Sequence, residues 1–377
     1  MPGWLKVLIT AALVTCAATV VYRTTIRHKL TDFGTYRMVA ARARAGQPLY
    51  QIVDGHYQFK YLPAFGIAAI PLTAMDLETS KALWFGISVF LLTAYVWSAA
   101  RMLPEPRRRT QVVIACTVLV MAKFYGHELN LGQTNVLLGV LLLAALAAAR
   151  AGRAGVAGAL IALATFVKPY ALVLLPWLAL SYGASAALVC LVCLAAGLVL
   201  PAAIYGWSGN LALLSGWART VIETTAPNLP DNDNISFAAM WVKWLGPGRA
   251  ASMLGVASTA AALALAAFVY RRRRRVAAPE YLEVALLMLF VPLISPQGWD
   301  YVLLLATPAV VCVVDRWVDL DRGWRIATVA ALAVMGLTLY DVMGRTLYLR
   351  FMALSFVSVA AIGLAMALAH LRSKALA

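Results

Sequence analysis

Asp32 is the residue whose position first suggests chemistry. It follows the first hydrophobic segment of the chain, Trp4–Tyr22, and the 377 residues include only 16 aspartates and glutamates. A carboxylate at the point where a membrane span meets a polar loop is a candidate general base. An aspartate at a helix N-cap can instead satisfy free backbone N–H groups. Position alone leaves both roles open, and they are compatible, because a helix N-terminus helps to keep a carboxylate ionised.

The segment that carries Asp32 is predicted to be a helix over Thr31–Gly46 that lies along the membrane surface. Its apolar residues recur at helical spacing and share one side, while Arg37 and Arg44 share another. The predicted apolar side consists of Phe33, Tyr36, Val39, Ala40 and Ala43.

Polar side chains also lie at the ends of two apolar stretches. His127 and Glu128 close one stretch, and Gln133 and Asn135 enter the next, Val136–Ala149. Amides without partners would be costly in such a position. The sequence leaves two roles open for these residues, which are hydrogen bonding between helices and recognition of sugar hydroxyls.

Lys168-Pro169 interrupts the otherwise apolar segment Gly155–Leu180. A lysine there is costly unless it reaches the interface, pairs with an acid or meets an anionic ligand. The proline also frees backbone groups beside it. A phosphate site is therefore one of the alternatives for Lys168.

Two further segments combine polar and aromatic residues. Segment 207–250 contains four tryptophans, which suit either a membrane interface or carbohydrate contact, and it includes the short glycosylation sequon Asn234-Ile-Ser236. Segment 295–301 is predicted to be a hairpin, for which a tight turn alone would explain its proline and glycine. A turn does not require Trp299 or Asp300, which could orient a substrate.

The composition indicates a polytopic α-helical membrane protein. Sixty-three per cent of the residues are hydrophobic and only 13% are charged, and the mean hydropathy is +0.80. So little polar surface could not cover a soluble protein of this size. Unbroken Ala/Leu/Val runs of spanning length exclude the alternation typical of a β-barrel.

The net charge of +16 is better explained by cationic loops that face anionic lipid than by nucleic-acid binding. We therefore expect membrane lipids as partners and no nucleic acid. The five cysteines all fall in hydrophobic segments, and Cys190 and Cys193 are assigned to helix packing. Neither a metal site nor a cofactor is predicted, because no cluster of metal-ligating residues is visible.

The arginine-rich turns predict the orientation, because basic residues in short loops lie on the cytoplasmic side. They indicate a single membrane domain over residues 1–377 with about twelve spans and both termini inside. Segment 61–75 is expected to lie at the interface without crossing, and 155–182 is expected to contain a broken helix. The two large extracytoplasmic loops are then 23–81 and 207–250. All the polar segments described above fall on that outer face.

The ordered motifs resemble those of glycosyltransferase family 87, whose members include polyprenyl-phosphate-mannose-dependent α-mannosyltransferases. The resemblance spans roughly residues 30–305 and implies the GT-C architecture, with an extracytoplasmic active site in the plasma (inner) membrane. The residues that carry it are Asp32-Phe-x-x-Tyr36, Gly46-Gln-Pro-Leu-Tyr50, Phe59-Lys-Tyr61-Leu-Pro63, Leu83-Trp84, Gly132-Gln133-Thr-Asn135, Lys168-Pro169-Tyr170 and Ser295-Pro296-x-x-Trp299.

The resemblance implies that Asp32 is the general base in an inverting transfer of a hexose, with mannose expected, from a polyprenyl-phosphate donor. The acceptor is expected to be a lipid or a glycan. We expect Lys168 to contact the departing phosphate. The chain departs from the family where Asp300-Tyr301 replaces a common histidine. Expected substrate-binding residues are Tyr36, His127, Glu128, Gln133, Asn135, Lys168, Trp299 and Asp300.

A transporter or lipid flippase is the alternative from another class. Such proteins place polar residues near the bilayer midplane and often contain internal repeats. No convincing repeat is visible in the sequence, and the polar residues gather on one predicted face. Both observations favour an enzyme.

Overall fold

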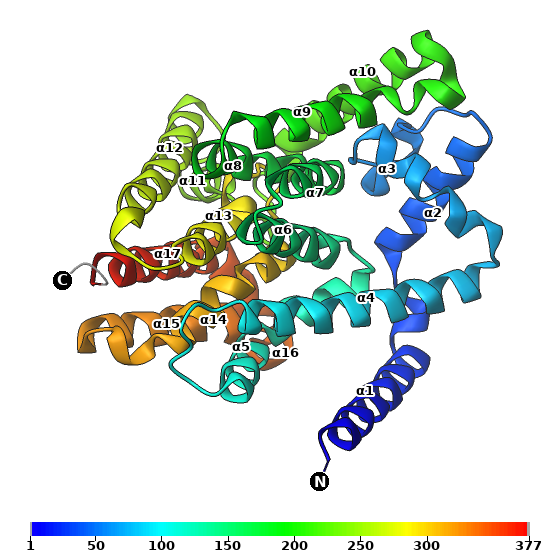
Figure 1. The fold of residues 1–377 in the computed structure, drawn as a ribbon. Helices are drawn as coiled ribbons and strands as arrows, with labels where there is room; N and C mark the ends of the chain where they lie inside the picture. The colour runs from blue at the N-terminus through cyan, green and yellow to red at the C-terminus, as the bar shows by residue number, and fades with distance from the viewer. Residues whose placement is uncertain (1, 375–377) are drawn as a thin grey trace.

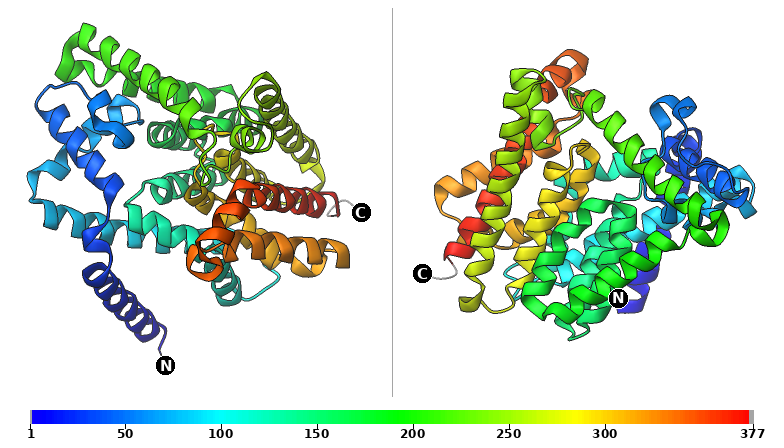
Figure 2. Two further views of the ribbon diagram at one scale, coloured as in Figure 1. Left: turned by 180° about the vertical axis from the view of Figure 1, so that it is seen from behind. Right: turned by 90° about the horizontal axis from the view of Figure 1, so that it is seen from above.

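The computed structural model describes residues 2–374, and within that range the chain is helical throughout, with seventeen α-helices and no strand. The all-α prediction is confirmed. Figure 1 shows α1 (Gly3–Thr24) standing apart from the main bundle, and the segment that follows it lying at one end of that bundle. In Figure 2 the yellow helix α13 (Glu280–Ile294) passes through the middle of the bundle. Nearly all its side chains are buried, as the unbroken apolar run over residues 284–294 requires.

Four helices are long and apolar enough to cross a membrane, and the number rises to six if two sharply bent helix pairs are each one span. The expected twelve spans are not confirmed, because several expected spans form helices shorter than the roughly 20 residues that a bilayer requires. The four long helices are α4 (Leu77–Arg101), α5 (Thr110–Leu131), α12 (Arg249–Arg271) and α17 (Phe356–Lys374). The bent pairs are α9 (Ala184–Val199) with α10 (Ala202–Asn228) at 91° and α15 (Arg322–Leu337) with α16 (Tyr340–Ala353) at 102°.

The shorter helices fill the core between the long ones. They are α6 (Asn135–Arg150), α7 (Ala154–Val167), α8 (Leu174–Tyr182), α11 (Phe237–Leu245) and α14 (Thr307–Asp315). A 3₁₀ segment precedes α8 (Pro169–Val173) and another precedes α14 (Asp300–Ala306). Lys168 has extended backbone angles and ends α7, and α8 contacts α7. The predicted break at Lys168-Pro169 is therefore confirmed.

The first large loop contains the predicted surface helix as α2 (Thr31–Arg44), and all five residues assigned to its apolar side are buried. Helix α2 is followed by a 3₁₀ segment (Ile52–Tyr57), α3 (Pro63–Ala68) and a second 3₁₀ segment (Ile70–Ala74). Neither α3 nor the segment after it is long enough to cross a bilayer. The salt bridge between Arg42 Nη1 and Asp54 Oδ2, at 2.6 Å, closes the turn after α2.

Segment 207–250, which was expected to be a large extracytoplasmic loop, is mostly helical. Helices α10 and α11 occupy most of it, and Ser236 caps α11 by accepting a hydrogen bond from the Ala239 N–H at 3.1 Å. Helix α10 packs on the first loop, because Trp217 donates through Nε1 to the Lys60 carbonyl at 3.1 Å. The buried face of α10 includes the polar residues Asn210 and Thr220, while Leu211 and Ile222 are exposed, so its sequence does not show an apolar helical stripe.

Arginine-rich turns meet at one end of the bundle. Arg273 Nη1 donates to Ser181 Oγ at 2.6 Å, and Arg150 Nη1 donates to the Met102 carbonyl at 2.8 Å. Arg372 Nη1 lies 3.2 Å from Glu283 Oε1 in a buried pair, which joins α17 to the start of α13. These contacts bring together turns that are distant in sequence and give the bundle a strongly cationic end.

Candidate functional site

A cavity of about 700 Å³ opens where the polar segments meet, at the opposite ends of the helices from the arginine-rich turns. Helix α6 starts beside the cavity and ends at Arg150, and α13 leads from Glu280 to Ser295 at the cavity wall. Seven of the nine residues expected in the site line it, and Glu128 and Asn135 do not. The seven are Asp32, Tyr36, His127, Gln133, Lys168, Trp299 and Asp300.

Asp32 lies in the first turn of α2 and not at its N-cap. The N-cap is Leu30, which adopts a left-handed conformation (φ 63°) and donates its N–H to the Asn130 carbonyl at 3.0 Å. The capping position expected for Asp32 is therefore wrong. The Asp32 side chain borders the cavity, and its Oδ2 accepts a hydrogen bond from Gln133 Nε2 at 2.7 Å.

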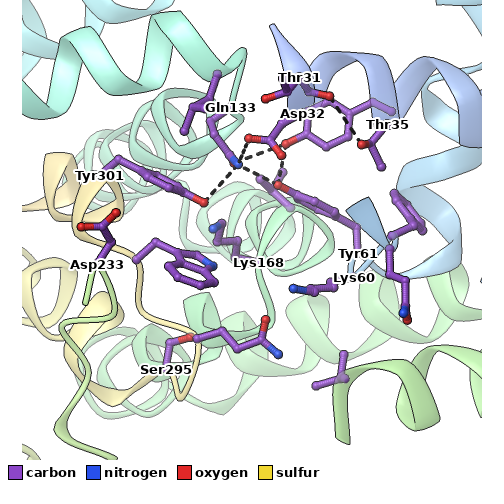
Figure 3. Close-up of a pocket in the computed structure, with 18 of the residues that line it drawn as sticks. Thr31, Asp32, Thr35, Lys60, Tyr61, Gln133, Lys168, Asp233, Ser295 and Tyr301 are labelled. Carbon is purple, nitrogen blue, oxygen red and sulfur yellow. Dashed lines mark hydrogen bonds between the residues drawn. The ribbon is translucent and has the colours of Figure 1, made fainter. Parts of the chain in front are cut away.

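Apart from its bond to Asp32, the Gln133 side chain contacts tyrosine hydroxyls, as Figure 3 shows. Its Oε1 lies 3.3 Å from the Tyr36 hydroxyl and 3.2 Å from the Tyr61 hydroxyl. Its Nε2 also donates to the Tyr301 hydroxyl at 3.2 Å. The hydroxyls of Tyr36 and Tyr61 also lie 2.7 Å apart, so one donates to the other and the second donates to the amide oxygen, which directs the amide nitrogen at Asp32. Tyr61 and Tyr301 were not predicted as site residues.

Two lysines supply positive charge to the cavity. Lys60 and Lys168 both line it, and both interact electrostatically with Asp32. Burial lowers the pKa of Lys60, and the nearby Asp32 carboxylate partly opposes that shift. Sequence reasoning missed Lys60, although it lies within the quoted Phe59-Lys-Tyr61 motif. The pair can contact an anionic group as two separate point charges.

Glu128 and Asn135 contact each other behind the cavity. Asn135 Nδ2 donates to Glu128 Oε2 at 2.7 Å, and the Val136 N–H donates to Glu128 Oε1 at 2.8 Å. Both side chains are fully buried. The carboxylate therefore satisfies a free N–H at the start of α6. Of the two roles left open by the sequence, the structure favours helix-to-helix hydrogen bonding for this pair.

Asp300 is paired with a lysine that the sequence did not single out. Lys123 Nζ lies 2.8 Å from Asp300 Oδ2, and each side chain is only 1% exposed. His127 Nδ1 lies 3.6 Å from the other carboxylate oxygen. Removing one partner of such a buried pair would leave an uncompensated charge. Asp300 thus borders the cavity with its own charge already balanced by Lys123.

Backbone hydrogen bonds join the hairpin 295–300 to the loop before α11. The Ile235 N–H donates to the Gly298 carbonyl at 2.7 Å, and the Asp300 N–H donates to the Asp233 carbonyl at 2.8 Å. A Cβ on Gly298 would lie 1.8 Å from the Pro292 carbonyl oxygen, so only glycine fits there. Asn234 is fully buried, which removes the sequon at 234–236 from consideration as a surface modification site.

The family model of glycosyltransferase family 87 matches residues 59–296. That range covers more than half of the 377 residues and includes Lys60, Gln133 and Lys168. The chain belongs to glycosyltransferase family 87. It is therefore a membrane glycosyltransferase, and the cavity is its candidate active site. Neither a curated protein nor a solved structure gave a significant match.

This glycosyltransferase has parts of its candidate site outside the matched range. Asp32 precedes residue 59, and Trp299 and Asp300 follow residue 296. The structure brings these three residues into the same cavity as the matched motifs. Among the side chains that the structure describes, no group of three or more histidines, cysteines, aspartates or glutamates is arranged to hold a metal ion.

Proposed function

We propose that this glycosyltransferase moves a hexose, with mannose as the first sugar to test, from a polyprenyl-phosphate donor to a hydroxyl of a lipid or glycan acceptor. One observation carries the proposal: a carboxylate, Asp32, and two lysines, Lys60 and Lys168, line one cavity. A base and an anion site in one cavity are the two functions that this transfer needs.

Asp32 is the general base in this proposal. Its carboxylate takes the proton of the acceptor hydroxyl while the hydroxyl oxygen attacks the anomeric carbon of the donor sugar. The bond from that carbon to the phosphate oxygen breaks, and its electron pair leaves with polyprenyl phosphate. Attack opposite the leaving group inverts the anomeric configuration, and the proton remains on Asp32 until it returns to solvent.

Lys60 and Lys168 contact the phosphate of the donor. Negative charge on the phosphate grows as the bond to the sugar breaks, and fixed cations stabilise that charge without moving. Gln133 holds the Asp32 carboxylate in position. Tyr36, His127, Trp299 and Asp300 contact the sugars. Glu128 and Asn135 have a supporting role instead of the substrate contact first expected for them.

The cavity faces the extracytoplasmic side of the plasma membrane in this proposal. The arginine-rich turns lie at the other end of the bundle, and such turns in short loops remain cytoplasmic. Further expected membrane spans are formed by a short α-helix together with its adjacent 3₁₀ segment. A 3₁₀ helix rises about 2 Å per residue against about 1.5 Å for an α-helix, so fewer residues cover the same thickness.

Proteoliposomes containing the full chain test the proposal. With labelled polyprenyl-phosphate mannose and a pool of lipid and glycan acceptors, we expect labelled glycosylated product. A nucleotide sugar supplied alone should give none. Transfer from the nucleotide sugar, or movement of lipid across the vesicle with no sugar transfer, would contradict the proposal and favour a different donor or a flippase.

A further inference from the structure

The cavity contains a second group of charges that the proposed transfer does not use. Asp231 and Asp233 both line the cavity. Figure 3 shows Asp233 on one side of the cavity and Lys60 on the other, with Lys168 between them. Asp32 lies near the two lysines, and Asp231 and Asp233 form a separate acidic side of the cavity away from Lys60. A ligand that carries charge at one end can bind in only one direction.

The acidic side is held by a network of hydrogen bonds. The Tyr348 hydroxyl donates to Asp233 Oδ1 at 2.8 Å, and the Asp233 N–H donates to Asp231 Oδ1 at 2.9 Å. Lys243 Nζ donates to the carbonyls of Asn232 at 2.8 Å and Asn234 at 2.7 Å. The loop that carries both aspartates is thus fixed at its backbone as well as at its side chains.

Lys123, His127 and Lys243 act on Asp233 electrostatically, but the contacts that fix them are with other groups. Lys123 pairs with Asp300 at 2.8 Å, and His127 Nδ1 lies 3.6 Å from the same carboxylate. Lys243 directs its ammonium group at backbone carbonyls. Burial, together with the charge of Asp300, raises the pKa of Asp233. A carboxylate accepts hydrogen bonds from hydroxyls, and a protonated carboxyl can also donate one, so Asp233 can bind a polyol in either form.

A tryptophan completes this part of the cavity. Trp299 lines it next to the hydrogen bond between the Asp300 N–H and the Asp233 carbonyl, and its ring provides apolar surface for the C–H face of a pyranose. Carboxylates beside a half-buried aromatic ring match a saccharide, which presents hydroxyls at its edges and C–H groups on its faces. They do not match a phosphate or a uronate, which the aspartates would repel.

We propose that the side of the cavity formed by Asp231, Asp233 and Trp299 is the acceptor subsite and takes an uncharged saccharide. The two aspartates determine specificity, because they accept hydrogen bonds from sugar hydroxyls and exclude acceptors with an anionic group at that end. This inference rests on the proposed function, which places the donor phosphate at Lys60 and Lys168.

Competition and binding measurements on the full chain in nanodiscs test this subsite. The probes are an octyl hexoside and the matching octyl hexuronide, which differ only in the carboxylate at C6, together with polyprenyl phosphate. We expect the unaltered chain to bind the hexoside at least tenfold more tightly than the hexuronide. The double variant Asp231→Asn, Asp233→Asn should reduce that ratio at least fivefold and leave polyprenyl phosphate binding within twofold.

Two further variants keep the result interpretable. Tyr348→Phe removes only the hydroxyl that holds Asp233, so it should reduce the ratio in the same direction by a smaller factor, even if the double variant fails to fold. Glu223→Gln is the matched control, because it neutralises an exposed carboxylate on α10 that does not line the cavity. It should leave the ratio unchanged.

The subsite would be overturned if the ratio of hexoside to hexuronide affinity were unchanged in both the folded double variant and Tyr348→Phe. Equal binding of hexoside and hexuronide by the unaltered chain would overturn it as well. The same preparations, assayed for transfer from polyprenyl-phosphate mannose, separate this result from the proposed function. Transfer with an unaltered acceptor preference in the variants contradicts the subsite alone. Absence of transfer by the unaltered chain contradicts the proposed function.

Discussion

Gln133 donates a hydrogen bond through Nε2 to Asp32 Oδ2 over 2.7 Å, which joins the turn before α6 to the first turn of α2. The hydrogen-bonded pair of hydroxyls of Tyr36 and Tyr61 contacts the amide oxygen and donates to it, so the amide cannot rotate without losing that bond. The proposed base therefore belongs to a preorganised network. A carboxylate fixed in this way needs no reorganisation before it meets an acceptor hydroxyl.

Gln133→Leu should lower kcat about 10- to 100-fold, because a misplacement of the base by about 1 Å costs that much in a reaction that depends on alignment. The KM for the donor should stay within about twofold, since the phosphate contacts remain. Initial-rate measurements with varied donor check both values. Gln111→Leu, at an exposed position on α5 away from the cavity, is the control and should leave kcat and the donor KM unchanged. A rise in donor KM with unchanged kcat would contradict the positioning role.

Lys168→Ala should raise the KM for the polyprenyl-phosphate donor about 10- to 100-fold, the range expected for a lost hydrogen bond to a charged group. The acceptor KM should change little, because the acceptor binds at the other side of the cavity. Lys168→Arg should retain part of the donor affinity. Two-substrate kinetics separate these effects, and unchanged donor kinetics in Lys168→Ala would argue against a phosphate site.

Polyprenyl phosphate binding should weaken as the pH rises, and at a lower pH than an ordinary lysine would give. Burial lowers the pKa of Lys60, so its charge is present below that lowered pKa and is lost above it. Lys60→Arg keeps a charge over the whole range and should move the loss of binding to higher pH. Titration of polyprenyl phosphate binding between about pH 7 and pH 10 measures the change. Lys29→Arg, an exposed position, is the control; identical pH dependence in all three proteins would count against Lys60.

Gly298→Ala should destabilise the protein by about 1–3 kcal/mol, because the added methyl group overlaps the Pro292 carbonyl oxygen. The same displacement would move Trp299 and Asp300, so activity should fall with stability. The midpoint of thermal unfolding in detergent, determined from the folded fraction at each temperature, measures the change. Gly34→Ala has open space around its new methyl group and should leave the unfolding midpoint unchanged or higher. An unaffected midpoint for Gly298→Ala would contradict the close packing of the hairpin.

Local sequence features predicted part of the site. The buried face of α2 follows from the spacing of Phe33, Tyr36 and Val39, and the break at Lys168 follows from the proline after it. These predictions depend on neighbours within a few residues. The N-cap of α2 did not follow, because the left-handed conformation of Leu30 is stabilised by a contact with Asn130, far along the chain.

Other members of the site depend on long-range packing and carry no local signal. Lys60 and Asp233 enter the cavity because the first loop packs on α10 and the loop before α11 pairs with the hairpin. Lys123 lies in an apolar helix, and only the folded chain shows its pairing with Asp300. The separation of Gln133 from Asn135 is a further example, since the helix turn directs one to the cavity and the other to Glu128.

The predicted span count is not confirmed, for a physical reason. Hydropathy identifies apolar segments, but it does not distinguish a helix that crosses a bilayer from a shorter one packed within a bundle. Residues 155–182 illustrate this, because the apolar run is divided between α7 and α8. Each piece alone is shorter than a bilayer requires.

The most direct test of the account is the rate of mannose transfer from polyprenyl-phosphate mannose by Asp32→Asn in proteoliposomes. Asparagine has nearly the same shape but is not a general base, so we expect a rate at least about 100-fold lower than that of the unaltered chain. The variant should retain the same unfolding midpoint and polyprenyl phosphate binding, and Asp341→Asn, at an exposed position on α16, should remain fully active. Full activity in folded Asp32→Asn would contradict the assignment of Asp32 as the base.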